Sequence, residues 1–256
     1  MSFITSRDNP RVRRWRELAR DTRVRRKERR ALIEGEHLVT ACIDAGWPIE
    51  VLILSKAAGS RYESLASKSG ATSILADTVF RFVADTESPT GIAAEIALPG
   101  AKTDLRSAQS CVFLEGIQDA GNVGTILRSA AAFGIRHAVL GRGCADAWSP
   151  KVLRAGMGAH FAAEIRENAD LPAALEAFGG RVACTVPGGG TPLRGADLSG
   201  RLGWLFGAEG RGVSGALAAR AQLRISIPMP GGAESLNVAA AAAICFYEFS
   251  TRAARS

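Results

Sequence analysis

Two glycine-rich stretches near the end of the chain decide the fold: Trp204-Leu-Phe-Gly-Ala-Glu-Gly-Arg-Gly-Val-Ser214 and Ile227-Pro-Met-Pro-Gly-Gly-Ala-Glu-Ser-Leu-Asn-Val238. Each begins as a short apolar strand, continues as a loop and ends at a predicted helix, an arrangement that exposes backbone N–H groups beyond a strand. Ser235 is predicted to be the N-cap of the alanine-rich helix, with Asn237 one turn inside it. Two such loops together can enclose a small ligand, although each alone has the composition of an ordinary turn.

A third glycine-rich loop, residues 116–124, follows the predicted strand at 111–115. The carboxyl ends of strands in an open parallel sheet share one edge, so we expect the three loops to meet at one crevice. If Asn122 caps the helix that follows, Arg128 lies between one and two turns inside it and is long enough to reach back toward that crevice.

Alternation of short apolar runs with helical patterns predicts an α/β protein of two domains. A small domain is expected at 1–100, beginning with a helix capped by Asn9 and continuing with a longer helix from about residue 25 to 46, interrupted near residue 34. Residues 98–104 have the composition of a linker. The second domain, 105–256, is expected to contain a mostly parallel sheet.

The first thirty residues are strongly basic. They contain twelve Lys and Arg against four Asp and Glu, a local net charge of +8 in a chain whose formal net charge is +7. Charge concentrated in this way indicates a polyanionic partner, and Arg13, Arg16 and Arg20 are its candidate contacts. The alternative is a solvated basic helix without a partner.

The lengths of the apolar runs and the spacing of cysteine and histidine narrow the class of protein. No apolar run reaches the length of a membrane span and the first residues lack the apolar segment of a signal peptide, so we expect a cytoplasmic protein without a membrane partner. Five cysteines and three histidines are widely separated in the chain. This spacing favours neither a metal site nor a nucleophile that depends on cysteine or histidine.

One further pattern points to a different ligand. Gly210-x-Gly212-x-x-Gly215 fits the fingerprint of a nicotinamide dinucleotide site, and it lies between a predicted strand and a predicted helix. That fingerprint normally opens its fold, whereas only about 40 residues follow it in this chain. We therefore disfavour a nicotinamide enzyme.

Three segments resemble, in order and spacing, the motifs of the SpoU (TrmH-like) RNA ribose 2′-O-methyltransferases of the SPOUT superfamily. They are Asn122-Val-Gly-Thr-Ile-Leu-Arg-Ser-Ala130, Leu205–Ser214 and Ile227–Val238. Residues 149–161 also resemble a family segment, and the basic start is similar to the L30e-like substrate-binding domain that many members carry. The resemblance covers nearly the whole chain.

The resemblance implies a trefoil knot in the second domain, a homodimer with its active site near the interface, and S-adenosylmethionine as cofactor. It implies five cofactor contacts: Gly207, Ile227 and Leu236 through backbone groups, and Met229 and Thr185 as further candidates. It implies a catalytic group of five residues: Arg128, Asn122, Glu209, Ser235 and Asn237. It also implies that the polyanion bound by Arg13, Arg16 and Arg20 is RNA.

Physical chemistry limits the roles of these residues. Transfer of a methyl group to a ribose hydroxyl is an in-line displacement in which positioning supplies much of the rate. A guanidinium is a poor base at neutral pH, so we interpret Arg128 as the group that orients the RNA and stabilises developing negative charge, and the proton acceptor stays open. Asn122 and Asn237 are expected to hold the loops. Glu209 is expected to pair with an arginine or balance the sulfonium charge, unless it only orders its loop.

The expected function is methylation of a ribose 2′-hydroxyl, with ribosomal RNA favoured over transfer RNA by the resemblance alone. The rival is a catalytically inactive RNA-binding or ribosome-associated module with the same fold. Two residues depart from the family pattern, because serine is common where Gly156 and Ala239 stand. These departures affect details of the cofactor or substrate contacts, and nothing in the residues identifies the nucleotide.

Overall fold

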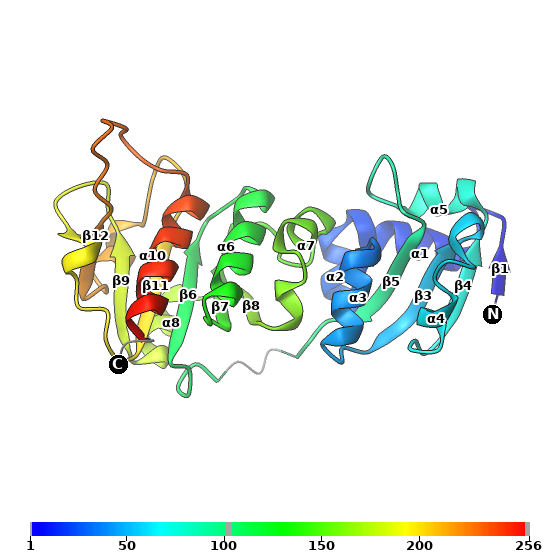
Figure 1. The fold of residues 1–256 in the computed structure, drawn as a ribbon, viewed down its shortest axis with the longest axis horizontal. Helices are drawn as coiled ribbons and strands as arrows, with labels where there is room; N and C mark the ends of the chain where they lie inside the picture. The colour runs from blue at the N-terminus through cyan, green and yellow to red at the C-terminus, as the bar shows by residue number, and fades with distance from the viewer. Residues whose placement is uncertain (1, 101–103, 254–256) are drawn as a thin grey trace. The chain divides into compact units, whose positions relative to one another are not determined.

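The computed structural model describes residues 2–100 and 104–253, and these residues form two units, each with its own sheet (Figure 1). Unit 1 contains residues 2–100 and 148–161, and unit 2 contains the remainder of the described chain. The sequence-based ranges, 1–100 and 105–256, differ from these units in the placement of 148–161. The α/β fold class is confirmed.

Unit 1 is a mixed sheet covered by helices on both faces. Its strands are β1 Ser2–Ile4, β2 Arg30–Glu34, β3 Ile49–Ser55, β4 Thr72–Leu75 and β5 Ile92–Ala97, in the spatial order β1-β4-β3-β5-β2. Its helices are α1 Pro10–Arg20, α2 Thr22–Glu28, α3 Glu36–Asp44, α4 Glu63–Ala66, α5 Asp77–Val83 and α7 Pro150–Gly156, with short 3₁₀ turns η1 Lys56–Ala58 and η2 Ala159–Phe161. Strand β5 runs antiparallel to β2 and β3, and the other pairs are parallel.

Helix α1 begins where the sequence predicts. The Asn9 side chain accepts a hydrogen bond of 2.9 Å from the Arg11 N–H, and Pro10 occupies the first helical position. The apolar residues at helical spacing are buried against the sheet: Val12, Trp15, Leu18 and Ala19. Figure 1 shows α1 and α3 on opposite sides of this sheet.

The predicted long helix at 25–46 is wrong, because strand β2 interrupts it. Arg29 adopts a left-handed conformation (φ 53°) that ends α2. The apolar run 31–33 then pairs with β5 and is fully buried. A short apolar run carries no periodicity that distinguishes a buried strand from a helix, so the pattern alone could not resolve this segment.

A buried carboxylate in β5 joins α1 to the sheet. Two 2.8 Å hydrogen bonds from the Arg14 guanidinium and one of 2.8 Å from the Trp15 indole N–H reach Glu95. Burial alone would raise the pKa of Glu95, but the hydrogen bonds from Arg14 and Trp15 and the charges of Arg14 and Arg30 outweigh it and lower that pKa. The charged form of Glu95 is therefore the one that stabilises the fold.

Residues 148–161 complete unit 1. The ring of Trp47 lies 6.0 Å from that of Trp148 and 5.6 Å from that of Phe161, measured between centroids. The Arg154 guanidinium also forms an ion pair of 2.8 Å with Asp85. A segment distant in sequence thus supplies part of the core of this unit.

Unit 2 is a parallel sheet with helices on both faces. Its strands are β6 Ser110–Glu115, β7 His137–Gly141, β8 Glu164–Ala169, β9 Arg181–Thr185, β10 Thr191–Pro192, β11 Leu202–Gly207 and β12 Leu223–Ser226, in the spatial order β10-β12-β9-β11-β6-β7-β8. Its helices are α6 Ala120–Ala132, α8 Leu171–Phe178, α9 Gly215–Ala218 and α10 Val238–Ala253, with a short 3₁₀ turn η3 Leu193–Gly195. All its strand pairs in the described residues are parallel, as expected.

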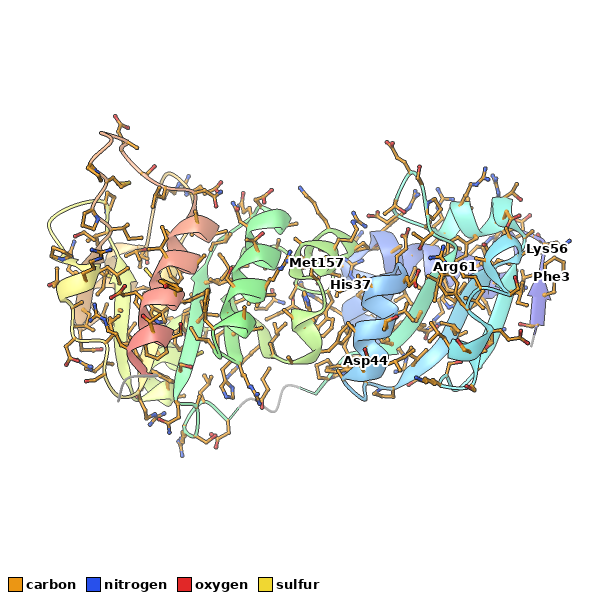
Figure 2. All side chains as sticks on the ribbon, in the orientation of Figure 1. Phe3, His37, Asp44, Lys56, Arg61 and Met157 are labelled. Atoms are coloured by element: carbon orange, nitrogen blue, oxygen red, sulfur yellow. The ribbon has the colours of Figure 1, made fainter. Side chains whose placement is uncertain are left out.

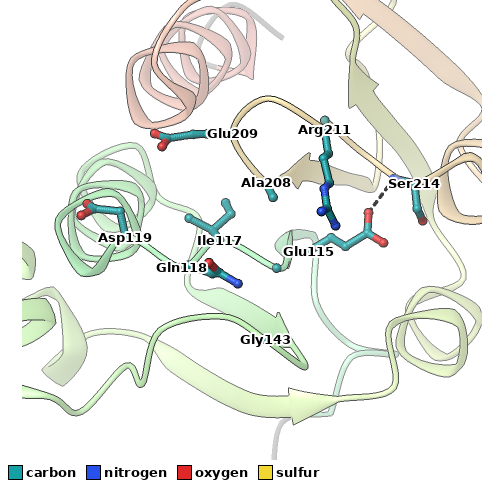
Figure 3. A pocket seen from close by; sticks show the side chains of 11 residues that line it. Glu115, Ile117, Gln118, Asp119, Gly143, Ala208, Glu209, Arg211 and Ser214 are labelled. Atoms are coloured by element: carbon teal, nitrogen blue, oxygen red, sulfur yellow. Dashed lines mark hydrogen bonds between the residues drawn. The ribbon is translucent and has the colours of Figure 1, made fainter.

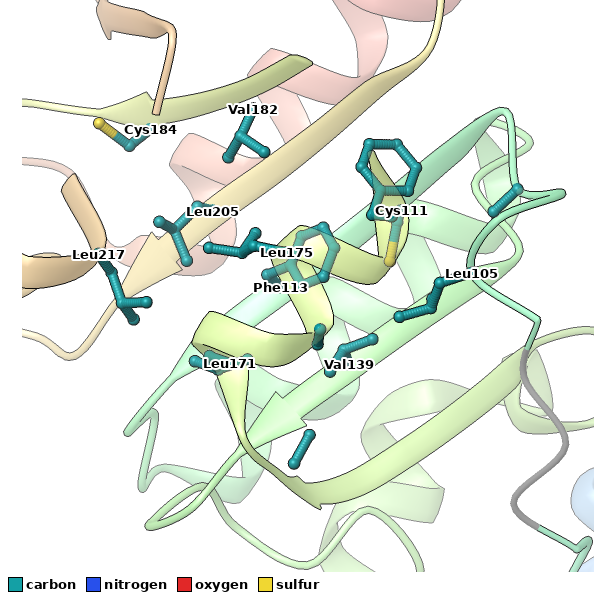
Figure 4. Packing of buried hydrophobic residues seen from close by; sticks show 14 residues of the cluster. Leu105, Cys111, Phe113, Val139, Leu171, Leu175, Val182, Cys184, Leu205 and Leu217 are labelled. Carbon is teal, nitrogen blue, oxygen red and sulfur yellow. The ribbon is translucent and has the colours of Figure 1, made fainter. Parts of the chain in front are cut away.

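Alternation along β11 builds the two layers of this core. Leu205 joins the cluster that packs α8 onto the sheet with Phe113 and Leu175 (Figure 4). Trp204 and Phe206 point to the opposite face, where their rings lie 6.3 Å and 5.7 Å from that of Phe246 on α10. Among the described residues, no helix combines the length and apolar character needed to cross a membrane.

Candidate active site

The three glycine-rich loops meet at the carboxyl edge of the unit 2 sheet. They follow β6, β11 and β12, and β11 lies next to β6 in the sheet. Asn237 from the third loop donates a hydrogen bond of 3.0 Å to the Asn122 carbonyl oxygen and one of 3.3 Å to the Glu209 carboxylate. Asn122 donates from its own amide to the same carboxylate oxygen. We call Asn122, Glu209 and Asn237 the edge cluster.

The backbone around the edge cluster fixes the two asparagines. Asp119, and not Asn122, caps α6, and its carboxylate accepts a hydrogen bond of 2.8 Å from the Asn122 N–H. Asn122 therefore lies in the first turn with its side chain free to reach Glu209. The predicted cap at Ser235 is also wrong, because Asn237 immediately precedes α10 and its side-chain oxygen accepts from the N–H groups of Ala239 and Ala240 at 2.9 and 3.3 Å.

The loop that carries Glu209 folds back tightly on the end of β11. A bridge joins Ala208 to Gly212, and a Cβ placed on Gly207 would lie only 2.0 Å from the Gly212 carbonyl oxygen. Glycine is therefore required at position 207 for steric reasons. The Glu115 carboxylate accepts a hydrogen bond of 2.7 Å from the Ser214 N–H and holds the other end of the loop.

Two members of the predicted catalytic group lie outside the edge cluster. Arg128, on α6, and Ser235 are both exposed, and neither side chain forms a hydrogen bond or ion pair with the described part of the chain. Both side chains are thus accessible to a substrate. The structure brings three of the five predicted residues together and leaves the other two at the surface.

The predicted cofactor residues lie at the ends of three neighbouring strands. Thr185 ends β9, Gly207 ends β11, and Ile227 and Met229 follow β12, in the spatial order β12-β9-β11. Leu236 has 37% of its surface exposed, which is unusual for a leucine beside a sheet edge. Four loop glycines at this edge would place a Cβ in open space, with nothing within 4 Å: Gly188, Gly189, Gly231 and Gly232.

A cleft of about 630 Å³ lies at the same edge, among the loops after β6, β7 and β11 (Figure 3). Sequence reasoning missed its polar residues Glu115, Gln118 and Arg211. Their position in the sequence could have indicated them, because each stands at the end of a strand or in a loop at the edge where ligands bind in open α/β sheets. Glu209 lines this cleft and belongs to the edge cluster as well.

The basic residues of unit 1 differ in their surroundings. Arg13 is exposed and pairs with Asp8, Arg20 is exposed, and the half-buried Arg16 guanidinium stacks 3.7 Å from the centroid of the Phe82 ring.

Phe3 on β1 is 57% exposed, and the Lys56 ammonium lies 5.9 Å from the centroid of its ring (Figure 2). An exposed ring beside a cation suits an unpaired base, which stacks on aromatic side chains.

Burial keeps the thiols of four cysteines unreactive. Burial raises the pKa of Cys42 and of Cys245 to about 12 and also raises that of Cys144 and Cys184, which keeps these thiols protonated. Among the described residues, no three His, Cys, Asp or Glu side chains are grouped so as to hold a metal ion. The helix after the Gly210-x-Gly212 pattern, α9, has four residues, too short for a dinucleotide fingerprint.

Comparison with known proteins gives matches along nearly the whole chain. The SpoU rRNA Methylase family model matches residues 109–247, and the MRM3-like substrate binding domain model matches residues 9–94. The chain is 36% identical over 252 residues to the 23S rRNA (guanosine(2553)-2′-O)-methyltransferase RlmP of Bacillus subtilis, covering 96% of this chain and 98% of that protein.

Solved structures agree. The AdoMet-bound rRNA methyltransferase from Sinorhizobium meliloti superimposes with a TM-score of 0.86 at 28% identity, covering 98% of both chains. The SpoU methyltransferase AviRb from Streptomyces viridochromogenes, solved in complex with AdoMet, has a TM-score of 0.85 at 24% identity, covers 96% of this chain and 98% of its own, and supports the fold.

Proposed function

The chain belongs to the SpoU rRNA Methylase family, and from this membership we propose that it transfers a methyl group from S-adenosylmethionine to a ribose 2′-hydroxyl of ribosomal RNA. Ribosomal RNA is favoured over transfer RNA because the relatives that match along the whole chain include rRNA methyltransferases. The chain is accordingly an enzyme. Nothing found supports the rival, an inactive RNA-binding module.

The observation that carries the proposal is the edge cluster. Three segments far apart in the chain place one carboxylate and two carboxamides in mutual hydrogen bonds at the carboxyl edge of the sheet. Hydrogen bonds to a carboxylate are stronger than neutral ones, so the cluster fixes the relative positions of the three loops. A carboxylate held in this way at the edge where ligands bind in open α/β sheets supports a site that positions a ligand.

The residues present fit S-adenosylmethionine. The exposed Leu236 side chain offers an apolar contact for a flat ring, and the open glycine loops after β9 and β12 leave backbone groups accessible to a ligand. When bound, this cofactor supplies a methyl group on a positively charged sulfur. We assign its binding to Thr185, Gly207, Ile227, Met229 and Leu236.

The chain's own residues would supply position and charge. Glu209, held by Asn122 and Asn237, places a negative charge beside the cationic donor and aligns the three loops. Arg128 is exposed on α6, and we assign to it the orientation of the RNA and the stabilisation of negative charge that develops on the ribose oxygen. Ser235 is assigned a contact with substrate or cofactor. These roles leave the proton acceptor unassigned.

In unit 1 we assign phosphate binding to Arg13, Arg16 and Arg20. This assignment agrees with the match of residues 9–94 to a substrate binding domain. The stacking of Arg16 on Phe82 would direct its guanidinium, whereas Arg13 must exchange its pair with Asp8 for a phosphate.

We also propose a homodimer, a trefoil knot in unit 2 and a cytoplasmic location. Apolar side chains of α10 support the dimer, because Ile244 and Tyr247 are 40% and 57% exposed. The contacts of Asn237 with the loops after β6 and β11 are compatible with a chain that threads back among them. The match along the whole chain to a bacterial rRNA methyltransferase supports the cytoplasmic location.

Methyl transfer tests the function directly. Purified protein is incubated with labelled S-adenosylmethionine and transcripts of 23S rRNA, and the product is digested with alkali. A 2′-O-methyl group blocks cleavage at its nucleotide, so a labelled, alkali-resistant dinucleotide is expected. Asn122→Ala should lower its yield. RNA binding without label in any ribosomal RNA would instead support the inactive module.

A further inference from the structure

The cleft beside the edge cluster is separate from the proposed cofactor site. The proposed cofactor residues belong to β9, β11 and β12, whereas the cleft is lined from the loops after β6, β7 and β11. Because β11 lies between β9 and β6 in the sheet, the cleft lies on the β6 side of β11, and the proposed cofactor residues at the ends of β9 and β12 lie on its other side. None of Thr185, Ile227, Met229 and Leu236 lines the cleft.

The edge cluster joins the two sides of β11. Glu209 lines the cleft, and its carboxylate accepts from Asn237, which follows β12 in the chain. A ribose held at the edge cluster with its 2′-hydroxyl toward the proposed cofactor residues would have its base on the side of the cleft. The proposed cofactor residues bind the methyl donor, so the base of the nucleotide still needs a binding site of its own.

The size and lining of the cleft suit a base better than a phosphate. Its volume of about 630 Å³ is within the range of small-molecule sites. Among its acidic lining residues, Asp119 accepts from the Asn122 N–H and Glu209 accepts from the Asn122 and Asn237 side chains, whereas one oxygen of Glu115 has no hydrogen bond within the described part of the chain. Such a carboxylate oxygen disfavours a phosphate and accepts N–H donors. Gly116 and Gly143 add no side chains to the wall, so a flat ring can approach closely.

Glu115 has the geometry of a reading residue. One of its oxygens, Oε2, accepts from the Ser214 N–H at 2.7 Å, which fixes the plane of the carboxylate. The other oxygen forms no hydrogen bond with the described part of the chain, and each oxygen has two lone pairs. Figure 3 shows the Arg211 side chain extending from its loop toward Glu115. The cleft thus offers acceptors from Glu115 and a fork of donors from Arg211.

We propose that this cleft binds the base of the nucleotide to be methylated and that Glu115 and Arg211 select guanine. Guanine presents two adjacent donors, N1–H and the 2-amino group, to a carboxylate, and its O6 and N7 accept from an arginine. Adenine, cytosine and uracil each place an acceptor where the carboxylate needs a second donor. The inference rests on the proposed function, and it makes Glu115 a specificity residue.

The test measures nucleoside binding without turnover. Saturation-transfer NMR on the full chain compares guanosine, inosine, which lacks the 2-amino group, and cytidine. Guanosine should bind about tenfold more tightly than inosine, which corresponds to one hydrogen bond to a charged group. Glu115→Gln should remove that difference while its amide oxygen still accepts from Ser214. Glu176→Gln, on α8 and outside the cleft, is the matched control.

A second pair of variants keeps the test independent of Glu115. Arg211→Gln should weaken guanosine binding, and Arg220→Gln, which is exposed and outside the cleft, should not. Equal binding of guanosine and cytidine, or wild-type selectivity in Glu115→Gln, would overturn the inference. Displacement of guanosine by S-adenosylhomocysteine would also overturn it, since the cleft would then belong to the cofactor. Absence of methyl transfer to any ribosomal RNA would contradict the proposed function alone, because nucleoside selectivity is measured separately.

Discussion

Replacing Gly207 with alanine should inactivate the enzyme through the loop at 208–214. The new Cβ would lie 2.0 Å from the Gly212 carbonyl oxygen and 2.3 Å from the Val213 nitrogen, both backbone atoms that no rotamer change can move. Ordinary contact begins at 3.4 Å, so the loop must shift by about 1.4 Å, the difference between 3.4 and 2.0 Å. That loop carries Glu209, and a misplacement of about 1 Å in a positioning group costs about 100-fold in rate.

The assay is single-turnover methyl transfer to 23S rRNA, with calorimetric titration of S-adenosylhomocysteine and thermal unfolding alongside it. We expect a rate about 100-fold lower, weaker cofactor binding and a loss of about 1–3 kcal/mol in stability from the forced repacking. Gly215→Ala is the control, because its Cβ would meet nothing within 4 Å. A Gly207→Ala enzyme with the rate and stability of that control would refute the steric argument.

Three further outcomes follow from other parts of the structure. Arg128→Ala should abolish turnover and leave calorimetric affinity for S-adenosylhomocysteine unchanged; wild-type turnover would refute its role. Joint replacement of Arg13, Arg16 and Arg20 by alanine should make the plot of log K for RNA against log salt shallower by about one unit per lost phosphate contact, and an unaltered slope would mean that these arginines are merely solvated. Glu95→Gln should cost about 3 kcal/mol in urea unfolding at neutral pH. The folded state lowers the pKa of Glu95, so the stabilisation by this carboxylate is complete above its ordinary pKa of 4.5 and is lost as pH falls through the folded pKa. The difference in unfolding free energy between variant and wild type should therefore narrow in acid, and a difference that does not change with pH would contradict this.

The sequence predicted the layers of the fold better than the ends of its elements. The predicted strand at 111–115 is β6, which begins one residue earlier, and the apolar run that begins at Trp204 is β11, which begins two residues earlier. The spacing of apolar residues along the chain shows which face of a strand or helix is buried, so it predicts the layers of the fold. Helix starts were harder: Asp119 and Asn122 are both good caps, and the glycine at 121 made the true first turn resemble a loop.

The edge cluster was predicted as a group, but its internal contacts were not. Asn122, Glu209 and Asn237 could be placed at one edge because parallel strands share it. Which pairs form hydrogen bonds depends on the strand order, in which β11 lies beside β6, and no local pattern encodes that order. The same holds for Glu115, whose partner Ser214 is 99 residues away.

The contacts of residues 148–161 bear on how far the two parts of this enzyme can be exchanged. Because Trp148 and Phe161 complete the aromatic cluster around Trp47, the first hundred residues are not a cassette that can be cut out at one junction. A chimaera that borrows another substrate-binding domain would have to import its own version of 148–161. The same contacts restrict which substitutions keep this cluster packed, so substitutions at position 47 should covary with those at 148 and 161 across related enzymes.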